Sequence, residues 1–220
     1  GGLDAVPLPH QQEPLAFGTR PDDDRWTAFV AGTRMAFISV QADEAEYYTK
    51  IESKQEQTKL AQGLPNVGDS SKSNKREAET VARLIHTLCQ LYSRSGIPFS
   101  PCKQIGIIVP FRAQIAMIRK ALAERHIPDT ADITIDTVER YQGSQRDIII
   151  FSTTVSRPYQ LSILSEPVMT DGREIDRKLN VALTRARKQF FMTGNETLLR
   201  NCTAYRKFLD FLSKEQILRL

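Results

Sequence analysis

The sequence is poor in the residues that bind metals or form disulfides. It contains only three histidines, and they form no spaced group with cysteines or carboxylates. The cysteines are odd in number and far apart, without the close CxxC pair of a zinc site or the framework of a secreted protein: Cys89, Cys102 and Cys202. We therefore predict that the chain holds no metal of its own and resides in a reducing, cytoplasmic compartment.

Long apolar segments are also absent. No apolar run approaches the roughly 18 residues that a membrane-spanning helix needs, so we expect no membrane partner. Hydrophobic residues make up 40% and charged residues 25% of the 220 residues, as in an ordinary soluble globular domain. The net charge of +4 comes from 30 basic and 26 acidic residues. That excess is too small to establish an anionic partner without knowing where the charges lie.

Two catalytic signatures are missing as well. No GxxxxGK[ST] loop occurs, so the chain has no glycine-rich loop and lysine with which to hold the β and γ phosphates of a nucleotide. No serine lies in a nucleophile-elbow context, and no cysteine has an identifiable catalytic partner. We therefore expect that the chain alone hydrolyses no nucleotide. Because it starts with Gly1-Gly2 instead of Met, we also expect that the natural protein begins upstream.

Short apolar runs alternate with segments of helical periodicity. Residues 1–30 are rich in Pro, Gln and Gly and are expected to form an extended connector. A polar excursion near 41–73 contains several loop formers. Strands are expected at 34–40, 104–109, 133–138, 147–152 and 189–193. Helices are expected at 74–92, 113–126, 175–186 and 204–212. This alternation predicts an α/β fold from 31 to 220, a parallel sheet flanked by helices, with the functional loops at the carboxyl ends of the strands.

Three segments carry the most specific pattern in the chain. They read IGIIVPFRAQ at 105–114, TIDTVERYQGSQRDIII at 134–150 and LNVALTRAR at 179–187. In order and in setting they resemble motifs of superfamily-one helicases related to the nonsense-mediated-decay RNA helicase and the replication helicase-nuclease. The resemblance covers roughly residues 34 to 195.

The resemblance implies a particular place in a larger enzyme. The chain would be the second, C-terminal RecA-like motor domain of an ATP-dependent helicase, without its own Walker A loop. ATP and Mg²⁺ would be bound mainly by an N-terminal RecA-like domain of the same parent chain. The other partner would be single-stranded DNA or RNA, and the family suggests 5′ to 3′ movement. The residues do not discriminate DNA from RNA, because both present phosphates and stackable bases.

Arg185 in the third segment is the candidate catalytic residue. Without the resemblance, an amphipathic helix with solvated arginines is the simpler interpretation. A guanidinium is permanently charged and planar, and it stabilises the charge that develops during phosphoryl transfer. By resemblance Arg185 is the arginine finger. Arg187 would lie about 200° away around a helix, so we assign it to the surface or to packing.

The second segment is expected to contact both ligands. By resemblance Gly143 and Gln145 face the nucleotide, whereas four residues face the nucleic acid: Thr134, Asp136, Thr137 and Gln142. A glycine permits close backbone approach to a phosphate, although a plain tight turn explains Gly143 equally well. Relatives commonly carry Glu where this sequence has Gln145, and Gln lacks the charge that accepts hydrogen bonds most strongly.

The first segment offers two more candidates for nucleic-acid binding. Pro110 ends a strand and leaves Arg112 and Gln114 on the loop or first helical turn, where they can reach a phosphate or base. A buried Phe111 beside a solvated Arg112 is an equally favoured interpretation. Asn74 and Glu77 match an Asn-x-x-Glu-Ala pattern of relatives, but their positions as N-cap and N3 residues of a capping box already explain them.

Two further hypotheses of other classes stay open. The chain could be a non-catalytic nucleic-acid-binding or docking module that keeps the fold after turnover has been lost, as Gln145 suggests. It could also be a free-standing α/β interaction domain. The missing phosphate loop favours a motor half that was separated from its partner.

Overall fold

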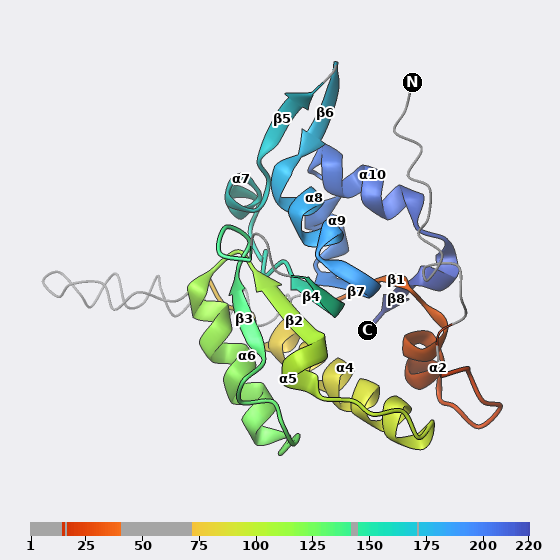
Figure 1. The fold of residues 1–220 in the computed structure, drawn as a ribbon. Coiled ribbons are helices and arrows are strands. Elements are labelled where there is room, and N and C mark those ends of the chain that lie inside the picture. The colour runs from red at the N-terminus through yellow and green to blue at the C-terminus, as the bar shows by residue number, and fades with distance from the viewer. Residues whose placement is uncertain (1–14, 16, 41–71, 142–144, 171) are drawn as a thin grey trace, which may run out of the picture.

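The computed structural model describes residue 15 and residues 17–40, 72–141, 145–170 and 172–220. Its centre is a six-stranded sheet in the order β3-β2-β4-β7-β1-β8, in which every neighbouring pair is parallel (Figure 1). The strands are β1 (Met35–Ser39), β2 (Ile105–Val109), β3 (Thr134–Thr137), β4 (Arg146–Ser152), β7 (Ala186–Gly194) and β8 (Ile217–Arg219). The predicted α/β, RecA-like fold is confirmed.

Helices cover both faces of the sheet. The first face packs against α2 (Arg25–Gly32), α4 (Lys75–Arg94), α5 (Pro101–Gln104) and α6 (Arg112–Glu124). The second face packs against α7 (Leu161–Leu164), α8 (Arg177–Thr184), α9 (Glu196–Leu199) and α10 (Thr203–Phe211). Alternate residues of each strand point into the two cores: Ile107 and Ile150 join the first, and Ile108 and Phe151 the second. The near-continuous apolar runs of β2 and β4 reflect this burial on both faces.

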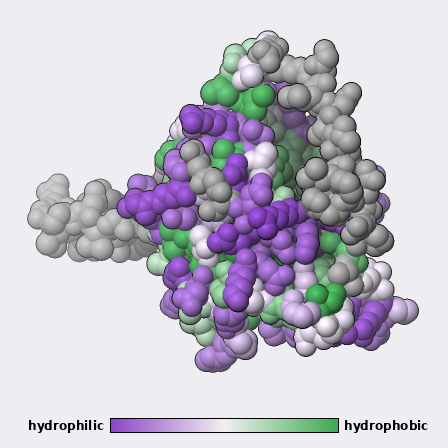
Figure 2. Space-filling model, viewed as in Figure 1, coloured by the Kyte–Doolittle hydropathy of each residue, from purple (hydrophilic) through white to green (hydrophobic). Residues whose placement is uncertain are grey.

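A small hairpin extends from the second layer. It consists of β5 (Pro167–Thr170) and β6 (Arg173–Asp176), which pair antiparallel. The surface over it is partly hydrophobic (Figure 2), and Val168 and Met169 are exposed there. Two short 3-10 helices, η1 (Pro158–Gln160) and η2 (Lys214–Gln216), complete the described elements.

Three expectations from the sequence need correction or remain outside the structure. Residues 25–30 are not part of an extended connector. They belong to α2, which Asp24 caps, and Trp26 and Val30 are buried in the first core. The helix expected at 175–186 is shorter, because residues 173–176 pair with β5 and the helix begins at Arg177 and ends at Thr184. Most of the polar excursion, residues 41–71, lies outside the described residues.

Candidate functional site

The candidate residues lie at both edges of the parallel sheet. Thr137 ends β3 at the carboxyl edge, whereas Gln145 directly precedes β4 at the amino edge. Arg185 precedes β7 at the same amino edge, since Arg146 is in register with Ala186. The expectation that all functional loops lie at carboxyl ends is therefore wrong for Gln145 and Arg185. The reason is that the connection from β3 to β4 must return across the sheet before a parallel strand can start.

That connection packs tightly against the second face. Val138 and Tyr141 are buried there. A Cβ added at Gly106 in β2 would lie 1.8 Å from the Tyr141 hydroxyl oxygen, so glycine is required for this close approach. Gln142 and Gly143, two predicted ligand contacts, lie outside the described residues.

Arg185 is held at the C-terminal end of α8. Its Nε donates to the Val181 carbonyl oxygen at 3.3 Å, and its Nη2 donates to the Thr184 hydroxyl at 3.3 Å. Its own carbonyl oxygen accepts from the Arg146 amide at 3.0 Å, which ties α8 to the start of β4. The side chain is half-buried and folded against its own helix. Neither contact involves an acidic group, so both can be exchanged for a phosphate.

Two more arginines stand beside Arg185. Arg146 donates to the Gln145 carbonyl oxygen at 2.9 Å and to the Thr134 hydroxyl at 3.2 Å. Arg187 Nε donates to Gln145 Oε1 at 3.4 Å. We call Arg146, Arg185 and Arg187 the amino-edge arginines. Arg187 is exposed, as expected, but the argument from helical rotation does not apply, because the helix has ended and Arg187 lies in β7. Thr134 lies with this group and not with Thr137.

The carboxyl edge carries the remaining candidates. Asp136 is half-buried, and its Oδ1 accepts from the Thr137 amide at 2.8 Å. Glu139, just beyond, pairs with Lys178 of α8 at 3.1 Å. Arg112 is exposed at the start of α6, whereas Phe111 is 5% exposed and packs inside. Arg112, Asp136 and Thr137 thus remain available on this edge.

Gln114 is not available there. It is fully buried, accepts from the Asn74 amide at 2.7 Å, and donates to the Asn74 carbonyl oxygen at 3.1 Å and the Ser152 hydroxyl at 3.3 Å. This burial contradicts its predicted contact with nucleic acid. The first turn of α6 directs position 114 inward, where its amide joins α6 to the start of α4.

A buried acid, Glu77, joins several elements at the carboxyl edge, although its place in the sequence predicted the N3 residue of a helix cap. Glu77 is fully buried, and its Oε2 accepts from the Ser152 hydroxyl at 2.8 Å, the Thr193 hydroxyl at 3.0 Å and the Thr154 amide at 3.1 Å. Burial raises the pKa of Glu77 to about 7, although the three hydrogen bonds oppose the shift. Its carboxylate thereby joins α4 to the ends of β4 and β7.

The capping interpretation is confirmed only for Asn74. Its Oδ1 accepts from the Glu77 amide at 3.0 Å. The reciprocal bond of a capping box would run from the Asn74 amide to Glu77, but Gln114 accepts it instead. Two features of the sequence could have indicated this buried network. One is the Asn-x-x-Glu-Ala pattern, and the other is the run of polar residues from Ser152 to Thr154 that follows the apolar part of β4.

Within the described ranges, no three His, Cys, Asp or Glu side chains are grouped closely enough to hold a metal ion. The described helices also include none with the length and apolar character to cross a membrane.

Comparison with known proteins identifies the family. Residues 21–197 match the model of a family described as an AAA domain. Similar proteins include putative helicase MOV-10 of Gallus gallus, which is 32% identical over 155 residues, or 64% of this chain. DNA polymerase alpha-associated DNA helicase A of Saccharomyces cerevisiae is 34% identical over 103 residues, 46% of the chain. The DNA replication ATP-dependent helicase/nuclease DNA2 of Bos taurus is 31% identical over 139 residues, 62% of the chain.

These alignments cover only a small part of each relative: 15% of MOV-10, 14% of helicase A and 12% of DNA2. The family model, in contrast, spans most of the chain. The chain therefore belongs to this AAA domain family, among the superfamily-one helicase domains related to the nonsense-mediated-decay helicase and the helicase-nuclease group.

Proposed function

We propose that this chain is the second motor domain of a longer ATP-dependent helicase that moves along single-stranded DNA or RNA. The observation that carries the proposal is that Arg146, Arg185 and Arg187 lie at one edge of the sheet, where the Arg146 amide donates to the Arg185 carbonyl oxygen and Arg187 donates to Gln145. Segments separated by about 40 residues come together there. Three guanidinium groups at one edge suit a triphosphate supplied by a facing domain.

Arg185 acts on the reaction by electrostatics. In ATP hydrolysis, water attacks the γ-phosphorus, the bond to the β,γ-bridging oxygen breaks and ADP leaves with its negative charge. A guanidinium directed at the γ-phosphate stabilises the charge that spreads over these oxygens. Mg²⁺ that accompanies ATP would neutralise further phosphate charge. Its ligands are expected on the first motor domain, since Asp147, the acid that follows Arg146 at this edge, is paired with Lys188 at 2.8 Å.

The nucleic-acid strand is proposed to bind at the carboxyl edge. Arg112 supplies a phosphate contact, and Asp136 and Thr137, with Gln142, supply polar groups at the end of β3. The β3–β4 connection begins at that edge and ends at the amino-edge arginines. A strand that displaces Thr137 therefore acts on the same short segment that ends in Gln145, which gives the two ligands a physical means of coupling.

Hydrolysis of ATP by the full-length parent protein, with and without a single-stranded oligonucleotide, tests the proposal. Arg185→Ala should lower strand-stimulated turnover by roughly 10³-fold or more, the scale of an arginine finger. Arg185→Lys keeps the charge but loses the planar fork, so it should recover only part of the rate. Nucleotide affinity is measured alongside, so that lost binding is not mistaken for lost catalysis.

An alternative is a non-catalytic nucleic-acid-binding module. The observation in its favour is Gln145, whose neutral side chain is engaged by Arg187 where relatives commonly carry a carboxylate. Strand binding by a wild-type parent that hydrolyses no ATP, or an Arg185→Ala variant with unchanged turnover, would favour this alternative.

A further inference from the structure

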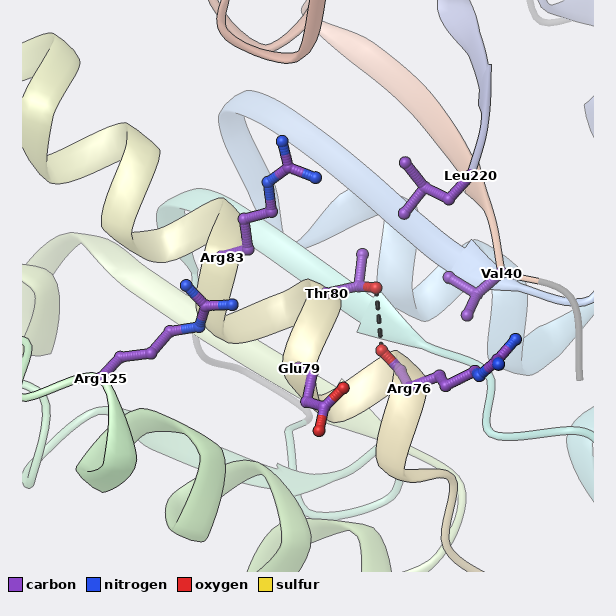
Figure 3. A pocket seen from close by; sticks show the side chains of 7 residues that line it. All are labelled: Val40, Arg76, Glu79, Thr80, Arg83, Arg125 and Leu220. Carbon is purple, nitrogen blue, oxygen red and sulfur yellow. Dashed lines mark hydrogen bonds between the residues drawn. The ribbon is translucent and has the colours of Figure 1, made fainter. Parts of the chain in front are cut away.

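A hollow with a volume of about 210 Å³ lies on the outer side of α4 (Figure 3). Seven residues line it: Val40, Arg76, Glu79, Thr80, Arg83, Arg125 and Leu220. Four of them come from successive turns of α4, Arg125 caps the C-terminal end of α6, and the two apolar residues follow β1 and β8. We call this hollow the α4 pocket. None of its residues belongs to the candidate site described above.

The α4 pocket is lined by more basic than acidic side chains. Three of the lining residues are arginines and one is an acid, Glu79, which also lies 3.6 Å from Lys75. Within the described part of the chain, no carboxylate forms an ion pair or hydrogen bond with the Arg83 or Arg125 side chain. Arg83 is instead stacked over the Trp26 ring, with its guanidinium carbon 4.2 Å from the ring centroid. Stacking orders this guanidinium, and Asp24 acts on it electrostatically without accepting a hydrogen bond from it in the described structure, so its N–H groups stay available to an anion.

The position of the pocket identifies the kind of anion. The Val40 amide donates to the Gly194 carbonyl oxygen at 2.8 Å, and the Leu220 amide donates to the Ser39 carbonyl oxygen at 3.2 Å. Both residues therefore mark the carboxyl edge of the sheet, the edge that also carries Arg112. Two strands, β4 and β7, separate β2 from β1. At about 4.8 Å per strand, the ends of β2 and β1 are roughly 14 Å apart along the sheet. Arg83 lies on the third turn of α4 and Arg125 at the C-terminal end of α6, so both residues are attached further from this edge than Arg112.

A nucleic-acid strand matches this spacing and chemistry. Roughly four stacked nucleotides, at about 3.4 Å each, span the interval from β2 to β1. The guanidinium groups of Arg83 and Arg125 suit a backbone phosphate, and Leu220, which is 54% exposed, offers an apolar surface against which a sugar or base can pack. We propose that the α4 pocket binds a backbone phosphate of the single strand where it leaves the carboxyl edge and passes over α4, beyond the nucleotides that contact Arg112. The direction of this path rests on the proposed function, whereas the pocket itself does not.

Fluorescence anisotropy of a labelled single-stranded oligonucleotide on the 220-residue chain tests the pocket directly. The double variant Arg83→Gln/Arg125→Gln should weaken binding about tenfold or more. Loss of one phosphate contact should also lower the slope of log affinity against log salt concentration by about 0.7. The matched control is Arg206→Gln/Lys207→Gln, which removes two exposed charges from α10 on the opposite face and should change little. Equal losses in the two double variants would overturn the proposal.

Three further arms separate the remaining outcomes. Arg125→Gln alone removes a side chain without a described partner, so a weaker complex cannot be ascribed to lost stacking on Trp26. Competition with inorganic phosphate and with polyglutamate shows whether the pocket prefers a free anion or an acidic peptide. If the pocket variants change only those affinities, the proposal fails. Arg112→Gln completes the design, because loss of oligonucleotide binding in this variant alone would leave the proposed function standing and remove the α4 pocket from the strand path.

Discussion

At the scale of single residues, the main feature is the buried carboxyl group of Glu77. Glu77 gives one carboxylate oxygen to three donors from two strands, and no basic side chain pairs with it in the described structure. A buried carboxylate without a cation is costly in its ionised form. Its place at the joint of α4, β4 and β7 makes the carboxyl edge sensitive to the protonation of a single group.

We predict that Glu77→Gln removes a pH dependence of folding stability. The pKa of Glu77 is raised in the folded state from 4.5 to about 7, so the folded state binds the proton more tightly than the unfolded state. This stabilisation is complete below pH 4.5 and is lost as the pH rises through about 7. The loss is on the order of 3 kcal/mol. Urea unfolding at a series of pH values measures it.

The control for this experiment is Glu79→Gln, an exposed acid two residues further along the same helix. Its stability curve should run parallel to that of the wild type, whereas the curve of Glu77→Gln should stay flatter between pH 4.5 and 7. Parallel curves for all three proteins would show that Glu77 does not titrate in this range.

At the scale of elements, α8 matters most because it ends at Arg185. Its start is anchored by Asp176, a buried acid that accepts from the Leu179 amide at 2.8 Å, the Glu166 amide at 2.9 Å and the Ser165 hydroxyl. These bonds join the helix to the segment before β5. The orientation of the helix, and with it the place of Arg185, therefore depends on its N-terminal cap.

We expect Asp176→Ala to destabilise the domain by about 1–3 kcal/mol, since the helix loses its cap and buried donors lose their acceptor. Asp176→Asn keeps one oxygen for the Leu179 amide and should cost less. Equilibrium unfolding in urea compares the three proteins. An alanine variant as stable as the wild type would mean that water or another side chain replaces the carboxylate.

At the scale of the whole molecule, the sheet separates two surfaces. The amino-edge arginines lie at one end of the strands, and Arg112 and Thr137 lie at the other, which Val40 and Leu220 of the α4 pocket also border. The β3–β4 connection starts at the carboxyl edge with Thr137 and reaches the amino edge at Gln145. Under the proposed function these are the two coupled surfaces, and the sequence lacks the phosphate loop that a complete nucleotide site requires.

The 220-residue chain should therefore bind a single-stranded oligonucleotide without turning over ATP. Release of phosphate is measured with and without the oligonucleotide, and anisotropy in the same samples reports binding. The full-length parent serves as the active control. Strand-stimulated hydrolysis by the isolated chain would show that the nucleotide site is complete within it, contrary to this expectation.

Much of this protein was determined by its sequence alone. Apolar runs predicted the strands β2 and β4, and helical periodicity predicted the helix α4. A strand buried on both faces reads as a continuous apolar run, whereas a helix buried on one face has apolar residues every three to four positions. The three motifs indicated the family and, by resemblance, Arg185 as a candidate. Local signals of this kind depend on neighbours within a few residues, and the structure shifted the ends of the helices and added α2 and the β5–β6 hairpin.

Only the tertiary structure decided which residues meet. Gln and Glu are residue types usually found at the surface, yet Gln114 and Glu77 are both buried, because hydrogen-bond partners from β4 and the start of α4 surround them. Arg187 contacts Gln145 across 42 positions, and Thr134 lies with Arg146 at the opposite edge from Thr137. The α4 pocket combines segments from both ends of the chain. Contacts of this range depend on strand order and crossover direction, which a local pattern of residues does not encode.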